Sequence, residues 1–160
     1  METLKNGLYI VSTPIGNLDD ISFRVKMVLN SVNFIICENP KHSLKLLNKL
    51  DIKKKLFSLH DYNESQLITR IEKYQYNSAI ALISDAGSPL ISDPGYNLMQ
   101  DYIKKKLYVT TIPGPSSIIS SLQLSGLPIN NFEFFGFVSK NKSSMNSQAK
   151  KLQNVITTSV

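Results

Sequence analysis

The stretch Ser84–Gly95 has the residue types best suited to holding a small molecule. It contains two similar turns, Ser-Asp-Ala-Gly and Ser-Asp-Pro-Gly, whose prolines fix the backbone and whose glycines allow close approach or a left-handed conformation. We expect Asp85 at the tip of the preceding strand, where its carboxylate can pair with a cation or accept hydrogen bonds from hydroxyl groups. The alternative is an elaborate turn whose aspartates cap local amides. The length of the stretch favours a ligand role.

Two further turns follow predicted strands. Thr13-Pro14-Ile15-Gly16-Asn17 has a single glycine, so it is neither a dinucleotide fingerprint, which needs three, nor a phosphate loop, which needs Gly-Lys-Ser/Thr. Pro113–Ser117 is interpreted as a strand-to-helix turn, and its prolines suit either a ligand contact or a rigid hinge.

Two titratable side chains are candidates for proton transfer or substrate contact. His60 opens a polar turn that includes Asp61, Asn63 and Glu64, and an imidazole there can orient a substrate hydroxyl or accept its proton. The alternative is a loop histidine at a helix cap. Glu38 ends the second predicted strand, where enzymes of the Rossmann type hold a ribose, but the glycines of the Rossmann fingerprint are missing here. We predict no metal site, because no set of ligands at suitable spacing accompanies the two histidines.

Short apolar strands alternate with amphipathic helices along most of the chain. This order predicts an α/β fold with a mainly parallel sheet, helices on both faces, and loops gathered at the carboxyl ends of the strands. The expected strands are 8–11, 34–37, 56–59, 79–83, 108–112 and 132–138, and the expected helices begin after a cap at Asp19 or Asp20, at His42, after a cap at Asn63, at Tyr96, and at Pro115 or Ser116.

Charge and composition narrow the class of protein. The 160 residues carry a formal net charge of +6, which suits a polyanionic partner such as RNA, although the lysines can equally solvate helix faces and turns. No apolar run is long enough for a membrane span, no secretory core is evident at the start, and a single cysteine excludes an internal disulfide framework. We expect a cytoplasmic protein without membrane contact.

Five motifs in the same order resemble one family, the SAM-dependent methyltransferases that modify a cytidine ribose of 16S ribosomal RNA in the small subunit, within the tetrapyrrole-methylase superfamily. The segments that carry the resemblance are Gly7–Ile21, Ser58–Glu64, Ser84–Gly95, Ile112–Ser117 and, together, Ser125–Pro128 with Phe132–Phe137.

The resemblance implies a dimer that binds S-adenosyl-L-methionine (SAM) between two domains and methylates a ribose 2′-hydroxyl of 16S rRNA in the small ribosomal subunit. Because that hydroxyl is a weak acid, its reaction needs proton removal or close placement. Our candidates on the catalytic side are His60 and Glu38, and those for substrate contact are Lys41, Asn63 and Asp93. The cofactor residues that the resemblance implies are Pro14, Asp85, Ala86, Gly87, Ser88, Pro89, Pro113, Gly114 and Ser116.

The chain departs from the family pattern in two places. Where the family has Cys-Glu-Asp-Thr-Arg-His, this sequence reads Cys37-Glu38-Asn39-Pro40-Lys41-His42, so a lysine replaces an arginine and its bidentate fork. The chain also ends slightly beyond half of a typical member. We therefore expect an N-terminal α/β domain at 1–117 and the start of an incomplete methylase domain at 118–160. We hypothesise that the isolated chain folds through about Ser125 but leaves the SAM cleft incomplete.

Two other functions remain open. One is a methylase of the same superfamily acting on a corrin or porphyrin precursor, although its glycine-aspartate-proline loop differs from Ser84–Pro89. The other is a non-catalytic RNA-binding or dimerisation module. Salt-sensitive RNA binding without SAM binding would favour the second alternative.

Overall fold

The computed structural model describes residues 4–153, 155 and 157–160, which divide into two units, 1–115 and 116–160. The first unit is a five-stranded parallel sheet with the strand order β3-β2-β4-β1-β5. Its strands are β1 (Gly7–Val11), β2 (Phe34–Cys37), β3 (Lys55–Ser58), β4 (Ala79–Ile83) and β5 (Val109–Ile112). The mainly parallel α/β fold is confirmed.

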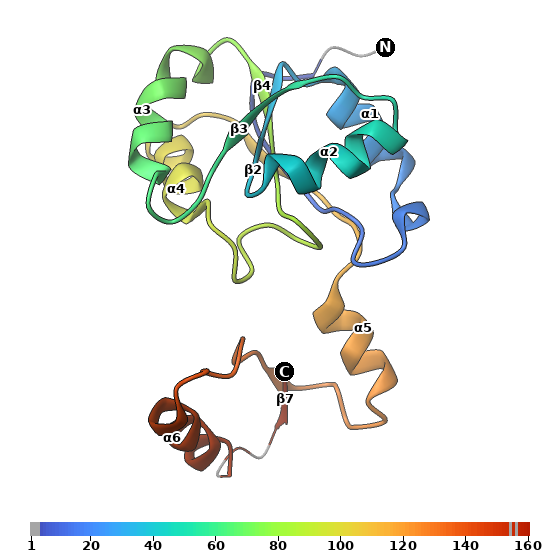
Figure 1. Cartoon of the computed structure of the whole chain (residues 1–160), viewed down its shortest axis with the longest axis vertical. Helices are drawn as coiled ribbons and strands as arrows, with labels where there is room; N and C mark the ends of the chain where they lie inside the picture. Colours follow the sequence, from blue (N-terminus) through green and yellow to red (C-terminus); the bar gives the residue numbers. More distant parts are fainter. Residues whose placement is uncertain (1–3, 154, 156) are drawn as a thin grey trace. The chain divides into compact units, whose positions relative to one another are not determined.

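Helices cover both faces of this sheet, as predicted (Figure 1). Alternate residues of the strands point to opposite faces. On one face, Ile35, Ala81 and their neighbours pack against α1 (Phe23–Ser31) and α2 (Pro40–Lys49). On the other, Ile36, Leu82 and their neighbours pack against α3 (Glu64–Gln75) and α4 (Tyr96–Lys104). The continuous apolar composition of β2 and β4 follows, because a strand buried on both faces needs no polar side.

The predicted start of α1 is wrong. Asp19 and Asp20 lie instead in a separate 3-10 turn, η1 (Leu18–Asp20), which Asn17 caps by accepting a hydrogen bond from the Asp19 N–H at 3.0 Å. The N-cap of α1 is Ser22, whose hydroxyl accepts from the Val25 N–H at 3.1 Å.

The predicted start of α2 is wrong as well, because Pro40 begins the helix rather than delaying it. A proline at the first helical position has no N–H to leave unpaired and its φ is already helical. Asn39 is the N-cap, and its side-chain oxygen accepts from the N–H groups of Lys41 at 3.1 Å and His42 at 3.3 Å.

The first turn of α4 depends on a carboxylate from another helix. Gly95 occupies the N-cap position and has no side chain to offer. Glu64 of α3 is only 6% exposed, and it accepts hydrogen bonds from the Leu98 N–H at 2.8 Å and the Asn97 side chain at 3.0 Å. The Glu64 carboxylate therefore joins α3 to the end of the Ser84–Gly95 loop.

The second unit contains α5 (Ser117–Leu124), β6 (Phe132–Glu133), α6 (Lys142–Leu152) and β7 (Thr158–Ser159), and β6 pairs in parallel with β7. The predicted start of α5 at Pro115 or Ser116 is wrong by one residue or two, because the helix begins at Ser117 and Ser116 is its N-cap. The strand predicted at 132–138 is wrong in length, because only two residues are extended in a ladder. Gly136 adopts a φ of 73°, so the backbone is not extended throughout the predicted range. The predicted domain division at 117/118 stays a prediction.

Candidate functional site

The strand register brings the candidate loops to one edge of the first unit's sheet. Val11 of β1 is level with Ile83 of β4 and Ile112 of β5, and Cys37 of β2 is level with both Ile83 and Ser58 of β3. All five strands are parallel, so the segments after them leave from the same edge. That edge is where ligands bind in open α/β sheets.

The order of the strands divides the candidate residues into two groups. The loops after β5, β1 and β4 are neighbours and carry the residues predicted for the cofactor. The ends of β2 and β3 lie beyond β4 and carry Glu38 and His60. The chain leaves β1 and β2 towards α1 and α2 on one face and leaves β4 towards α4 on the other, so the connections change face on both sides of β4, next to β1 and next to β2. A ligand is expected in the crevice at such a point.

The three loops predicted for the cofactor are in direct contact. Thr13 and Gly87 exchange two backbone hydrogen bonds of 2.8 and 3.1 Å, and the hydroxyls of Ser12 and Ser88 are 3.0 Å apart. Gly114 packs against Ser12 so closely that a Cβ on the glycine would lie 2.9 Å from the Ser12 Cβ. The loops after β1, β4 and β5 therefore form one continuous surface within residues 1–115.

The Ser84–Gly95 loop has an unusual backbone. Gly87 has a φ of 80° and Gly95 a φ of 123°, while Leu90 and Ser92 also adopt positive values of 74° and 66°. Side-chain-bearing residues rarely adopt this conformation and pay about 1–3 kcal/mol each where they do. Such strain clusters at ligand sites, which supports the interpretation of this loop as more than a connection.

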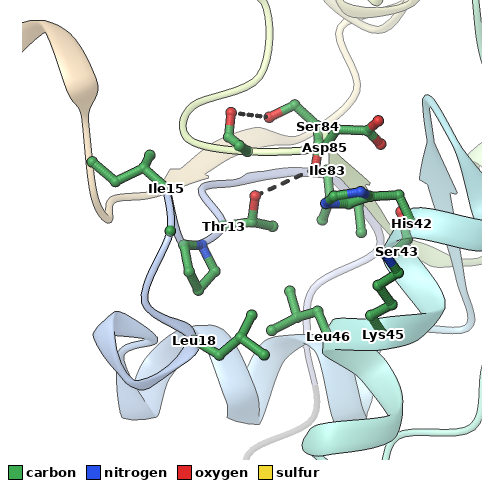
Figure 2. Close-up of a pocket in the computed structure, with 13 residues that line it drawn as sticks. Thr13, Ile15, Leu18, His42, Ser43, Lys45, Leu46, Ile83, Ser84 and Asp85 are labelled. Atoms are coloured by element: carbon green, nitrogen blue, oxygen red, sulfur yellow. Dashed lines mark hydrogen bonds between the residues drawn. The ribbon is translucent and has the colours of Figure 1, made fainter.

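A cavity of about 410 Å³ lies where the β1 and β4 loops meet α2 (Figure 2). Its walls are mainly apolar, and the polar groups are concentrated on α2 and at the end of β4. The lining residues are Thr13, Pro14, Ile15, Gly16, Leu18, His42, Ser43, Lys45, Leu46, Ile83, Ser84, Asp85 and Ala86. This volume falls within the range of small-molecule sites.

The sequence did not single out the cavity residues on α2. Figure 2 shows that α2 contributes His42, Ser43, Lys45 and Leu46 to the cavity wall. His42 and Lys45 are three residues apart and so share a helix face. The sequence did contain a signal for this arrangement, because Asn39 followed by Pro40 is typical of a helix start. A helix that begins at Pro40 brings His42 to the edge of the sheet.

Four carboxylates lie close enough to affect one another, and one of them, Asp85, lines this cavity. Partial loss of water, followed by repulsion from Asp85, Asp93 and Asp61, raises the pKa of the Glu38 carboxyl above its ordinary value. Burial likewise raises the pKa of Asp93, although the Ser84 hydroxyl opposes this rise and Asp85 adds to it. Asp85 also accepts a hydrogen bond from the Asn39 N–H at 3.2 Å. These carboxylates favour a cationic ligand group on their side of the site, whereas Lys45 of α2 adds a positive charge to the cavity wall.

The raised pKa of Glu38, caused first by loss of water and then by charge repulsion, gives a prediction for the pH dependence of stability. Because the pKa of Glu38 is higher in the folded state than in the unfolded state, its contribution to stability is fully present below the unfolded value and is lost as the pH rises through the folded value. Glu38→Gln is expected to raise the free energy of unfolding at pH 7 by a few tenths of a kcal/mol, allowing for solvent screening, and to have no such effect near pH 4.

Urea unfolding of Glu38→Gln at pH 4, 5.5 and 7 measures this effect. Asp20→Asn, an exposed carboxylate of η1 outside the cluster, serves as the control and is expected to show no matching increase. A Glu38→Gln gain that was equal at all three pH values would contradict the assigned cause.

The remaining predicted side chains occupy different positions. His60 is exposed, and its backbone N–H donates to the side-chain oxygen of Asn63 at 2.9 Å. Asn63 also donates to the Ser58 carbonyl at 3.0 Å, and at the N-cap position of α3 it makes no side-chain capping bond. Asn63 therefore holds the conformation of the turn. Lys41 is exposed at the start of α2. Asp93 lines a small space together with Glu38 and Pro89.

The last three candidates for cofactor binding, Pro113, Gly114 and Ser116, follow β5 in the chain. Pro113 and Gly114 are exposed in the turn after β5. Ser116 belongs to the second unit, where its hydroxyl accepts from the Ile119 N–H at 3.4 Å. In the part of the chain that the structure describes, no three His, Cys, Asp or Glu side chains form a group that could hold a metal ion. No helix among the described residues is long and apolar enough to cross a membrane.

The fold and this edge site define a class of protein. The family model for Tetrapyrrole (Corrin/Porphyrin) Methylases matches residues 7–159. Among solved structures, the chain is similar to a diphthine synthase, with a TM-score of 0.66, 14% identity, and coverage of 91% of this chain and 60% of that one. It is also similar to a uroporphyrin-III-C-methyltransferase from Thermus thermophilus, with a TM-score of 0.56, 17% identity, and coverage of 81% and 59%. At these identities the likeness shows the fold alone.

Curated relatives narrow the class. The Ribosomal RNA small subunit methyltransferase I of Vibrio cholerae is 47% identical over 141 residues, which are 86% of this chain and 49% of the relative. The protein of the same name from Thermotoga maritima is 40% identical over 152 residues, 93% of this chain and 68% of the relative. The chain thus belongs to the tetrapyrrole methylases and, within them, to the ribosomal RNA small subunit methyltransferase I family. It spans about half the length of the first curated relatives it matches.

Proposed function

We propose that this chain takes part in SAM-dependent methylation of a cytidine ribose 2′-hydroxyl of 16S rRNA in the small ribosomal subunit. The observation that carries the proposal is the direct contact among the loops after β1, β4 and β5, which gives one surface at the crevice of the sheet. The names of the curated relatives support the RNA substrate over a corrin or porphyrin precursor. We extend the proposal to a cytoplasmic homodimer by resemblance to the family.

The residues of this surface fit SAM. Gly114 and Gly87 allow the loops to pack closely enough to form one surface: a Cβ at Gly114 would meet Ser12, and one at Gly87 would come within 3.3 Å of Ile15. The negative potential of Glu38, Asp85 and Asp93 suits the sulfonium and amino groups of SAM. In this assignment, the residues that bind the cofactor are Pro14, Asp85–Pro89, Pro113, Gly114 and Ser116.

The proposed chemistry divides the edge of the sheet into two sides. When bound, SAM supplies an activated methyl group at the crevice between β1 and β4. On the β2–β3 side, the imidazole of His60 accepts the proton of the ribose hydroxyl, and Asn63 holds the turn that presents His60. Glu38 orients the ribose, Lys41 contacts the RNA backbone, and Asp93 lies where it can accept from a substrate hydroxyl.

His60→Ala is expected to lower the rate of methyl transfer by about 10²–10⁴-fold, which is typical for loss of a general base, and to leave SAM affinity unchanged. Transfer of labelled methyl to unmodified small subunits measures the rate. It is measured for the chain alone and for a chimera in which the Vibrio cholerae relative supplies the remaining length. His42→Ala, at the other histidine, is the comparison.

A His60→Ala protein as active as the unchanged protein would remove His60 from the mechanism. Failure of both unchanged proteins to methylate small subunits, while either methylated a tetrapyrrole, would contradict the proposed substrate.

A further inference from the structure

Tyr62 presents an aromatic ring almost entirely to water at the edge of the sheet that carries the site. Tyr62 is 94% exposed, whereas neighbouring side chains normally cover most of a tyrosine ring. Tyr62 lies in the turn after β3, two residues from His60, and the two rings are 6.4 Å apart between centroids with their planes tilted by 53°. Among the described residues of the first unit, 4–115, no packing contact accounts for this exposed ring.

The turn that carries Tyr62 is held in place by hydrogen bonds. The Asn63 N–H donates to the His60 carbonyl at 3.0 Å, and the Asn63 side chain joins the His60 N–H to the Ser58 carbonyl. The turn is also tied to β2, because the Leu59 N–H donates to the Cys37 carbonyl at 2.9 Å and the Ser58 hydroxyl donates to the Glu38 carbonyl at 3.1 Å. The backbone of the turn that carries the ring is therefore held in place, so it needs little further ordering when a ligand covers the ring.

The charges around the turn select the part of a nucleic acid that can approach. Asp61 is next to Tyr62 in the chain, and it acts with Asp85 and Asp93 on Glu38, so the potential here is negative. Backbone phosphates are repelled from such a position, whereas the face of a base is uncharged and stacks on a tyrosine ring. The basic residues of this part of the sheet edge are on α2, where Lys41 is exposed.

We propose that Tyr62 is a stacking platform for a base of the RNA substrate and positions that nucleotide beside His60. The inference rests on the proposed function and names a contact within it. Tyr62 provides the base contact, and Lys41 provides a phosphate contact. Tyr62 is a positioning residue, because it holds the nucleotide without touching the reacting atoms.

The chain contains no tryptophan, so a single replacement provides a direct probe. Tyr62→Trp places the sole indole at the proposed platform. Tyr76→Trp is the matched control, because Tyr76 is 57% exposed and precedes β4 at the opposite edge of the sheet, where its carbonyl accepts from the Asn6 side chain. Short oligocytidylate is expected to quench the emission of Trp at position 62 and not at position 76. Inorganic polyphosphate, which has the charge but no bases, is expected to quench neither.

Substitutions separate stacking from charge. Tyr62→Leu is expected to weaken oligocytidylate binding between about fivefold and a hundredfold, and Tyr62→Phe to stay within about twofold of the unchanged chain. The slope of log affinity against log salt is expected to stay the same in Tyr62→Leu and to fall by about 0.7 in Lys41→Ala.

Equal affinity of the Tyr62→Leu and unchanged chains for oligocytidylate, with no quenching at position 62, would overturn the platform and leave the proposed function intact. A changed salt slope in Tyr62→Leu would also overturn it, because the ring would then be acting through charge. Failure of the unchanged chain to bind oligocytidylate or small subunits would overturn both the RNA proposal and this inference.

Discussion

Alanine in place of Glu64 is expected to lower the free energy of unfolding by about 2–3 kcal/mol, the largest change from any single carboxylate of the first unit. The substitution removes both acceptors of the first turn of α4 and leaves the Leu98 N–H buried without a partner. It also removes a negative charge from the positive end of the helix, where such a charge is stabilising. Urea unfolding monitored by circular dichroism measures the loss.

Glu72→Ala is the matched control for this prediction. Glu72 is also on α3 and also contacts α4, through Lys105 at 3.1 Å, but its side chain is 59% exposed. Exposed ion pairs contribute about 0–1 kcal/mol, so the control is expected to cost less than about 1 kcal/mol. Equal losses in the two variants would contradict the role assigned to burial and capping at Glu64.

Valine in place of Gly114 is expected to weaken SAM binding at least about tenfold, equivalent to about 1.4 kcal/mol. A Cβ at this position would lie 2.9 Å from the Ser12 Cβ and 3.5 Å from the Ser12 carbonyl oxygen, so the turn after β5 must move away from the β1 loop. Overpacking of this kind costs about 1–3 kcal/mol. The displaced turn no longer forms one surface with the loops after β1 and β4.

Thr111→Val is the control for Gly114→Val, because it introduces the same side chain into the strand that leads to the turn. Thr111 is exposed, and its hydroxyl makes only a 3.4 Å hydrogen bond to the Ile10 carbonyl. Calorimetric titration with SAM compares the two variants. Unchanged SAM affinity in a folded Gly114→Val protein would show that the turn after β5 lies outside the cofactor site.

The fold was predictable from the sequence where burial alone determines the element. The apolar runs of β2 and β4 have no other stable position than the centre of a sheet covered on both faces. Helix starts were less predictable, because several residues near α1 can cap a helix and only the path of the chain decides among them. Asp19 and Asp20 are residues that often cap a helix. Here they lie in η1, which Asn17 caps, and Ser22 is the N-cap of α1.

The site was predictable in part for a related reason. Small-residue turns after strands are visible in the sequence, and the parallel register then brings those turns to one edge. The contribution of α2 was not predicted, because it depends on the helix starting at Pro40 and turning His42 and Lys45 towards the β1 and β4 loops. The short length of β6 was also not predicted from the apolar residues at 132–138, and the left-handed conformation of Gly136 is not evident from the residues beside it.

The central claim is that the edge formed by the loops after β1, β4 and β5 binds SAM, with Asp85 as a principal contact. Calorimetric titration of SAM into the 160-residue chain, alongside Asp85→Ala, tests it most directly. Although we hypothesise that the cleft is incomplete, the loops after β1, β4 and β5 all lie within residues 1–115. We therefore expect saturable binding of one SAM per chain, weakened at least about tenfold by Asp85→Ala, because a charged hydrogen-bond partner is lost. Absence of binding by the folded chain, or binding that Asp85→Ala leaves unchanged, would contradict it.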